Sequence, residues 1–388
     1  MRIAMFYHSL RSCWNHGNAH FLRGVVSELT ARGHRVTVLE PEDGWSRGNL
    51  VREEGPEAEA AYRTAYPGLE SVLYRLDTLD LDRALDGVDL VLVHEWNDPA
   101  LVARVGAHRR SAGYLLLFHD THHRAITAPR EMARFDLRDY DGVLAFGDVV
   151  RRSYLERGWI QRAWTWHEAA DVRVFYPRHE VPRGDLVWIG NWGDEERSAE
   201  LGEFLLEPAR ALGLSGSVYG VRYPEPAQQA VRAAGLRYQG WLPNHRAPEV
   251  FSRHRVTVHV PRRPYAGALP GVPTIRPFEA LACGIPLISA PWRDDDDLFM
   301  VGRDYLVAHD GEEMRRCLRA VLSDVDLATA LGDCGRRTIL ERHTCAHRVD
   351  ELFGIVRALR RQAGARERRL GYQVAPSEPP RAAAGGGA

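Results

Sequence analysis

The chain has 388 residues, too many for one ordinary hydrophobic core, and this length suits two α/β domains. Its 51 basic and 52 acidic side chains leave a net charge of −1, which excludes a global field that would attract nucleic acid or an anionic membrane. The sequence contains no lysine, which excludes Schiff-base enzymes, P-loop proteins and kinases with a strand lysine. Anionic ligands must therefore be held by arginine, backbone N–H groups and helix N-termini.

The cellular location is predicted from the N-terminus, the apolar runs and the cysteines. The first residues show no charged-then-apolar leader, and no apolar run approaches the length of a membrane span. The five cysteines are scattered and form no CxxC pair, which indicates reduced thiols. We therefore expect a cytoplasmic protein without stable membrane insertion.

The first half of the chain predicts a parallel sheet that begins with a strand at residues 2–7. Apolar residues recur at helical spacing over 19–31, Gly33 ends this helix, and a second strand follows at 36–39. Strand, helix and strand in this order form a βαβ unit. Continuous apolar runs, typical of strands buried on both faces, then cover residues 90–93, 114–118 and 142–146. Polar residues follow each run, at the sheet edge where doubly wound folds bind ligands.

The second half predicts another sheet of the same kind, after a proline-containing link at residues 174–183. Its apolar runs cover residues 186–189, 217–219, 256–260 and 286–289. The sequence therefore predicts an α/β fold with two Rossmann-like domains. The predicted division has domains at 1–176 and 184–344, a C-terminal helix at 345–370 that packs back on the first domain, and a disordered tail at 371–388.

Residues 271–286, GVPTIRPFEALACGIP, predict a turn, a short helix and the start of a strand. The N–H groups of Thr274 and Ile275 would open the helix, where a diphosphate can bind. Arg276 adds a permanent charge with bidentate geometry. Glu279 lies one turn further on, where it can accept hydrogen bonds from a ribose diol. The alternative is that Glu279 is an ordinary residue of the helix surface.

This segment resembles the donor-binding motif of group 1 (family 4-like) glycosyltransferases of the GT-B fold, in which a glutamate begins an E-A-x-A-C-G-x-P run. Its T-x-R-x-F-E form resembles the CgeB-like branch of that family. Further matches follow the family's order along the chain: Gly17–His20, Arg32–Val36, Ala170–Val172, Phe175–Pro177, Tyr219–Gly220, Gly240–Leu242 and His343–Arg348. The resemblance covers residues 1–359.

The resemblance implies a hexosyltransferase-type enzyme (EC 2.4) that transfers sugar from a nucleoside diphosphate sugar held in a cleft between the two domains. It implies retention of configuration and no metal or cofactor. Arg197 and Asn191, after the first strand of the second domain, are expected to bind the donor. Gly17, Asn18 and His20 are expected to reach the donor from the first domain. The acceptor would be a small molecule, glycan or protein, and no nucleic acid partner is expected.

Four histidine and aspartate residues follow the apolar run at 114–118. In similar enzymes a histidine at this strand end meets the donor sugar, which suggests His119 as the catalytic group and Asp120 as the residue that orients it. A metal site is the rival interpretation, because His122 and His123 follow closely. Two adjacent histidines on one element cannot aim at the same ion, and we predict no metal. Histidines that merely line a polar loop are the third interpretation.

Some positions depart from the family pattern. Gly271 stands where many members have a second glutamate that contacts the donor sugar, and the family's phosphate-binding pair of basic residues is not plainly present. Arg197 is the best candidate for one half of that pair, with a solvated helix start as the alternative. Arg262 and Arg263 suit either phosphate binding or surface charge. The four aspartates at 294–297 are predicted to form a solvated acidic loop.

Two further classes of function remain open at the level of sequence. A non-catalytic nucleotide-sugar-binding protein is suggested by Gly271 in place of the usual glutamate. A nucleotide-sugar epimerase, or a metal-dependent hydrolase that uses the histidines at 119–123, is the other alternative. The donor base, the sugar and the acceptor are not named by any motif.

Overall fold

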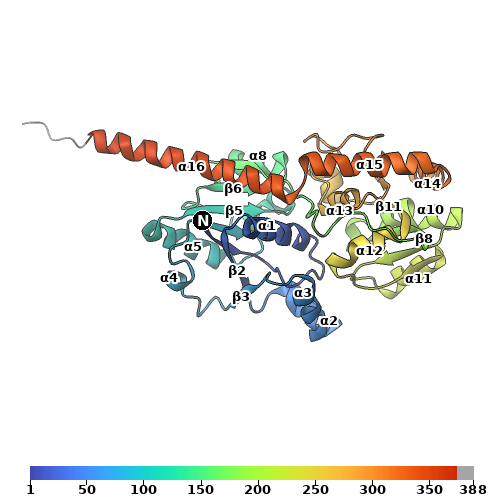
Figure 1. The fold of residues 1–388 in the computed structure, drawn as a ribbon, viewed down its shortest axis with the longest axis horizontal. Coiled ribbons are helices and arrows are strands. Elements are labelled where there is room, and N and C mark those ends of the chain that lie inside the picture. Colours follow the sequence, from blue (N-terminus) through green and yellow to red (C-terminus); the bar gives the residue numbers. More distant parts are fainter. Residues whose placement is uncertain (374–388) are drawn as a thin grey trace, which may run out of the picture. The chain divides into compact units, whose positions relative to one another are not determined.

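The computed structural model describes residues 1–373, with side chains up to residue 362. Its contacts group residues 1–349 into one compact unit and residues from 350 onward into a second. In Figure 1 the first sheet and its helices run from blue to green, and the second from green to orange. Both sheets lie within the first unit.

The N-terminal sheet has seven parallel strands in the order β3-β2-β1-β4-β5-β6-β7. The strands are β1 (Arg2–Phe6), β2 (Arg35–Pro41), β3 (Ser71–Tyr74), β4 (Leu90–His94), β5 (Leu115–Asp120), β6 (Gly142–Ala145) and β7 (Ala163–Thr165). The helices are α1 (Ala19–Ala31), α2 (Trp45–Glu54), α3 (Pro56–Ala65), α4 (Leu81–Ala84), α5 (Pro99–Ala112), α6 (Arg124–Thr127), α7 (Pro129–Met132) and α8 (Asp148–Glu156).

The C-terminal sheet has six parallel strands in the order β10-β9-β8-β11-β12-β13. The strands are β8 (Gly184–Ile189), β9 (Gly216–Tyr219), β10 (Leu236–Tyr238), β11 (His254–His259), β12 (Leu287–Ser289) and β13 (Leu306–Val307). The helices are α9 (Ser198–Leu201), α10 (Glu207–Leu212), α11 (Glu225–Ala233), α12 (Ala247–Ser252), α13 (Ile275–Ala282), α14 (Gly311–Ser323), α15 (Val325–Arg342) and α16 (Cys345–Gln373).

The strands predicted from apolar runs are all present, with ends shifted by one or two residues. Every residue of β4 and β6 is buried, as expected for strands covered on both faces. Four strands lie outside those predictions: β3, β7, β10 and β13. Each lies toward the end of its sheet and has two to four residues, so none carries a long apolar run. Short, partly exposed strands of this kind are the usual solution at a sheet edge.

The link at 174–183 contains no helix or strand and joins the two sheets. The chain later returns to the first domain, where Ala170 forms a parallel bridge with Thr344. At the start of α16, the Nε of Arg348 donates to the carbonyl oxygen of His167 at 2.8 Å. The predicted packing of the rest of this helix on the first domain stays a prediction, because residues from 350 onward form a separate unit. Of the tail predicted at 371–388, the part after Gln373 lies outside the described residues.

Within the part of the chain that the structure describes, no helix combines the length and the apolar character that a membrane span requires.

Candidate functional site

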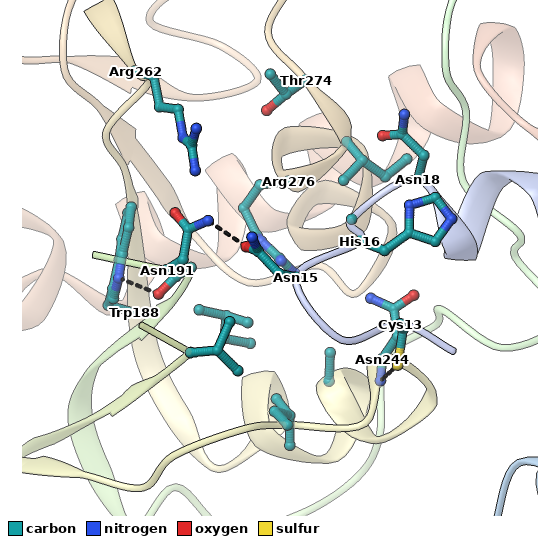
Figure 2. A pocket seen from close by; sticks show the side chains of 18 of the residues that line it. Cys13, Asn15, His16, Asn18, Trp188, Asn191, Asn244, Arg262, Thr274 and Arg276 are labelled. Atoms are coloured by element: carbon teal, nitrogen blue, oxygen red, sulfur yellow. Dashed lines mark hydrogen bonds between the residues drawn. The ribbon is translucent and has the colours of Figure 1, made fainter. Parts of the chain in front are cut away.

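A pocket of about 220 Å³ opens between the carboxyl edges of the two sheets. The loop after β1 lines it from the N-terminal domain, and the ends of β8 and β11 together with the start of α13 line it from the other domain. The predicted donor residues on its wall are Gly17, Asn18, Asn191, Arg197, Thr274, Ile275 and Arg276. Figure 2 shows several of these side chains pointing into one space. Gly17 and Arg276, which are 259 positions apart in the sequence, thus line one pocket.

The start of α13 forms one wall of this pocket. Thr274, immediately before the helix, has φ 66° and ψ −179°, a conformation that a β-branched residue rarely adopts. Its side chain makes no capping hydrogen bond, so the first N–H groups of α13 are not satisfied by Thr274 itself. Backbone strain of this kind costs about 1–3 kcal/mol and concentrates at ligand sites. Thr274 and the start of α13 therefore combine an unusual backbone conformation with a place on the pocket wall.

Three arginines contribute positive charge to the same wall: Arg197, Arg262 and Arg276. The Nη2 of Arg197 donates to the carbonyl oxygen of Asn191 at 2.7 Å, and its Nη1 donates to the carbonyl oxygen of Val260 at 3.1 Å. Burial, and next the charges of Arg262 and Arg276, lower the pKa of Arg197 to about 9. Among the residues that the structure describes, no carboxylate pairs with Arg197, and its Nε is buried without a hydrogen-bond partner. An anion in the pocket would relieve this concentration of charge.

Sequence reasoning left Arg262 open between phosphate binding and surface charge, and the structure places it on the pocket wall, where it also pairs with Glu196 at 3.0 Å. Arg263 differs, because it points to the surface and pairs with Glu200.

Glu279 lies behind the pocket wall and is fully buried. Its Oε1 accepts a hydrogen bond from Asn244 at 3.0 Å and lies 3.0 Å from the Nδ1 of His20, while its Oε2 contacts Arg276. Burial by itself would raise the pKa of Glu279, but Arg276, and next His20 and Asn244, outweigh it and hold the pKa below its usual value. The predicted contact of Glu279 with a ribose stays a prediction; here the carboxylate holds Arg276 at the pocket.

His20 also lies outside the pocket lining, and it connects the two domains. Its Nε2 accepts a hydrogen bond from the N–H of Asp171 at 2.7 Å, so the proton is on Nδ1, which donates to Glu279. The ring stacks on Phe175 with centroids 3.8 Å apart. His20 thus fixes the position of Glu279, whereas direct donor binding by His20 stays a prediction.

The structure places His119 in the core of the first domain, away from the pocket lining. Its ring lies 4.8 Å from that of Trp166 and 5.2 Å from that of His94, and neither of its nitrogens has a hydrogen-bond partner. Asp120 instead accepts hydrogen bonds from Tyr154 and from the backbone of His122. The expectation that Asp120 orients His119 is therefore wrong, because successive residues of β5 point to opposite faces of the sheet.

Replacing His119 by methionine is expected to change how stability depends on pH. Burial lowers the pKa of His119 to about 3, whereas the unfolded chain binds that proton near its ordinary pKa of about 6.5. The unfolded state therefore gains protons first as the pH falls, and the folded protein loses stability between pH 6.5 and pH 3. Relative to pH 7, this residue's contribution at pH 5 is a loss of about 2 kcal/mol, which the methionine variant should lack.

Urea unfolding of wild type and His119→Met at pH 7 and pH 5 measures this difference. Identical pH dependence would show that the ring is not sealed in the core. Donor turnover of the same variant tests the predicted catalytic role: a fall of 100-fold or more, with unchanged unfolding at pH 7, would support that role.

Metal ligation by the histidines at 119–123 finds no support in their arrangement. Among the residues that the structure describes, no group of three or more His, Cys, Asp and Glu side chains is placed to hold a metal ion. His123 pairs instead with the hydroxyl of Thr127, with 2.6 Å between Nδ1 and Oγ1. His122 lines a second cavity of about 430 Å³ that is lined in part by the same loop, Asn15–Asn18, as the first pocket.

Cys13, Asn15 and Trp241 are among the pocket residues that the sequence did not predict. Asn15 bonds to Asn191 across the two domains, and the thiol of Cys13 accepts from the backbone of Asn244 at 3.3 Å. Trp241 also lines the pocket, and the sequence indicates it only as part of the family match at Gly240–Leu242. Isolated polar residues in loops carry no periodic signal, so a single sequence does not distinguish them from solvated ones.

Gly271, three residues before Thr274, has φ 83°, and the carboxylate of Asp296 fills the space that a side chain would need. A Cβ at this position would lie 2.4 Å from the Cγ of Asp296. The glutamate that many similar enzymes have at this position is therefore sterically excluded from this backbone. Asp296 in turn lies 3.1 Å from the Nε2 of His167 and accepts from the N–H of Asp148, which joins the two domains.

The prediction of a solvated acidic loop at 294–297 is wrong for two of its four residues. Asp296 makes the contacts with the first domain described above. Asp294 accepts hydrogen bonds from the backbone N–H groups of Leu298 and Phe299, at 3.0 and 2.8 Å. Both roles depend on the folded arrangement of the loop, which a run of like charges does not reveal.

Replacing Gly271 by alanine is expected to lower the free energy of unfolding by at least about 2 kcal/mol, because it combines a left-handed backbone with a steric clash. Gly267→Ala is the matched control, since no atom lies within 4 Å of its missing Cβ. Chemical denaturation of both variants measures the difference. Equal stability of the two would show that the loop at 294–297 moves away freely.

The amino-acid sequence matches the family model described as "Glycosyl transferase-like" over residues 197–354. No curated protein sequence matches the chain at a significant level.

Solved structures resemble the chain over 92% of its length. One is sucrose-phosphate synthase from Thermosynechococcus elongatus, with a TM-score of 0.62, 15% identity and 99% of that chain covered. Another is an alpha-glucosyltransferase in complex with UDP and DNA, with a TM-score of 0.64, 13% identity and 99% of that chain covered. A third is Anabaena HepE in complex with UDP-glucose, with a TM-score of 0.63, 11% identity and 100% of that chain covered.

At these identities the likeness concerns the fold, and it agrees with the two parallel sheets and the pocket between them. The chain therefore has the GT-B fold of glycosyltransferases, and its C-terminal half carries a glycosyl transferase-like sequence.

Proposed function

We propose that the protein transfers a sugar from a nucleoside diphosphate sugar to an acceptor, and that the pocket between the two sheets binds the donor. The observation that carries this proposal is the convergence of Arg197, Arg262 and Arg276 on the open start of α13. Guanidinium groups and backbone N–H donors are the partners that a diphosphate requires, and the chain has no lysine to replace them.

The residues that line this pocket suggest how the donor is oriented. Val221, Trp241 and Leu242 line one part of it and offer apolar surface to a nucleobase. The loop at Asn15–Asn18 is common to this pocket and to the cavity of about 430 Å³. We place the diphosphate at the arginines and the transferred sugar toward that cavity.

We propose UDP as the first nucleotide to test, because the solved structures of similar fold include glycosyltransferases in complex with UDP or UDP-glucose. When the bond from the sugar to the diphosphate breaks, negative charge develops on the phosphate oxygens. The fixed charges of Arg197, Arg262 and Arg276 would stabilise it without reorganisation. This arrangement supports a mechanism that needs no metal, and we also propose hexosyl transfer with retention of configuration, as in the family 4-like, CgeB-like group.

A thermal-shift experiment tests the donor site with UDP-, GDP-, ADP- and TDP-sugars, each with and without a chelator. A ligand at a hundredfold excess over its Kd adds about 2.7 kcal/mol to the stability of the native state. We expect UDP-sugars to raise the melting temperature, and the chelator to have no effect on that shift. If none of the four nucleotide classes shifts the melting temperature, the donor-site assignment fails.

A non-catalytic nucleotide-sugar-binding protein is the second candidate, and the observation that favours it is the occupied space beside Gly271. In that case the donor would bind with the expected thermal shift, but no nucleotide would be released from it by any acceptor or by water. Detection of free UDP during incubation with UDP-sugar distinguishes the two functions.

A further inference from the structure

A large open groove continues from the proposed donor site across the N-terminal domain. It encloses about 990 Å³ at the carboxyl ends of β1 to β4. His8, Trp45 and Trp96 line both this groove and the cavity of about 430 Å³, which in turn borders the donor pocket. These three side chains therefore stand between the place of the transferred sugar and the groove. We name the space of about 990 Å³ the acceptor groove.

The two tryptophans are exposed although their large rings would normally be buried. Trp45 is 49% exposed and Trp96 is 40% exposed, while Trp166 and Trp188 are almost completely buried. Exposed apolar surface gathered in a concave site marks binding, because folding alone would favour its burial. An indole face combines apolar area with a negative quadrupole, which suits a flat ligand that presents C–H groups. The C–H face of a sugar ring has this character.

His8 lies between the two indoles, with its ring 6.4 Å from that of Trp45 and 5.7 Å from that of Trp96. No hydrogen bond to another described residue occupies its ring nitrogens, whereas the neighbouring His16 bonds to the carbonyl oxygen of Ser9. Burial, and next the charge of Arg124, lower the pKa of His8 to about 4. At neutral pH the ring is uncharged and has one free acceptor nitrogen, so it can accept a hydrogen bond from a hydroxyl group.

The charged side chains that line the acceptor groove disfavour anionic ligands. Its lining includes the four carboxylates of Glu42, Asp43, Asp77 and Asp98 against two arginines, Arg75 and Arg104. Arg75 pairs with Asp77 at 3.0 Å, and Arg104 donates hydrogen bonds to the carbonyl oxygens of Leu76 and Leu79. A nucleic acid or a phosphorylated acceptor would meet net negative charge here.

We propose that the acceptor is a carbohydrate without negative charge, which stacks a sugar ring on Trp45 and Trp96 and directs its reacting hydroxyl to the ring of His8. This inference rests on the proposed transferase function and adds the class of the acceptor. In the transfer, the acceptor oxygen bonds to the anomeric carbon of the donor sugar while the bond from that carbon to the diphosphate oxygen breaks. The hydroxyl proton leaves on the diphosphate, because a ring that titrates near pH 4 orients a hydroxyl but is a weak base.

The test is binding of the full-length protein, with saturating UDP, to an array that contains neutral, amino-substituted, uronic and sulfated saccharides together with duplex DNA. We expect retention on one or more uncharged or amino saccharides and none on the anionic probes. Trp45→Ala and Trp96→Ala should each weaken this retention at least tenfold, and Trp96→Phe should restore most of it. Leu340→Ala, at a 41% exposed position on α15, is the matched control and should bind as wild type does.

His8→Phe tests the hydroxyl contact separately, because phenylalanine keeps the ring and loses the nitrogens. We expect an acceptor KM at least tenfold higher with an unchanged Kd for UDP. UDP binding measured on every variant separates the two levels of the proposal. If UDP binds but neither an uncharged nor an amino saccharide is retained, or if the tryptophan variants bind as wild type does, the acceptor class is wrong and the donor site stands. If wild type binds none of UDP, GDP, ADP and TDP, both are wrong.

Discussion

Replacing Glu279 by alanine is expected to lower the free energy of unfolding by about 3–5 kcal/mol and to abolish donor binding. Its carboxylate is fully buried and meets Arg276, His20 and Asn244 at once. Removal of one partner from a buried ionic cluster leaves the other charge without compensation, which is why the cost is high. Arg276 would also lose the group that holds it at the pocket wall.

Urea unfolding and titration with UDP measure these two effects. Glu279→Gln keeps a hydrogen-bonding oxygen for Asn244 but removes the charge, so we expect a smaller loss of stability. Glu200→Ala is the matched control, because its pair with Arg263 is partly exposed and exposed pairs contribute no more than about 1 kcal/mol. A loss below about 1 kcal/mol for Glu279→Ala would contradict the role of this carboxylate as the centre of the cluster.

Replacing Arg197 by methionine is expected to weaken UDP binding at least 100-fold while changing the stability of the free protein by less than about 1 kcal/mol. A hydrogen bond to a charged group contributes about 1.5–3 kcal/mol, and about 1.4 kcal/mol corresponds to a tenfold change in affinity, so loss of two such bonds to phosphate reaches that range. In the free protein the loss of three hydrogen bonds, two to Asn191 and one to Val260, is offset because the repulsion from Arg262 and Arg276 disappears.

Isothermal titration with UDP and urea unfolding give the two values for Arg197→Met. Arg263→Met serves as the control, since this neighbouring arginine is 57% exposed in its side chain and lies outside the pocket. UDP binding by Arg197→Met at wild-type strength would place the diphosphate elsewhere. A large loss of stability would instead give Arg197 a structural role.

Much of the fold could be predicted because its signals are local. Apolar runs such as Leu90–Val93 specify buried strands, and the helical spacing over Ala19–Ala31 specifies a helix whose bounds the structure reproduces. The edge strands were missed for the same reason: β7 and β13 have three and two residues, and their residues are only partly buried. A run of two or three partly buried residues is too short for a periodic pattern that would distinguish a strand from a loop.

Part of the candidate site also follows from sequence. The order Thr274, Ile275, Arg276 at a helix start predicts a phosphate-binding segment, and the structure places all three residues on the pocket wall. Because the chain has no lysine, arginine is the only permanently charged side chain that could bind an anion, and Arg197 and Arg262 both line the pocket. These inferences depend on residue type and on position at an element end, which one sequence contains.

The sequence by itself therefore determined the two parallel sheets and the helix start that carries Arg276. Only the tertiary structure decided that Glu279 is bound by His20 from 259 positions away, that His119 points into the core, and that Asp296 fills the space at Gly271. The reason is physical: propensity and periodicity act over a few residues, whereas the partner of a buried charge is chosen when distant segments pack together.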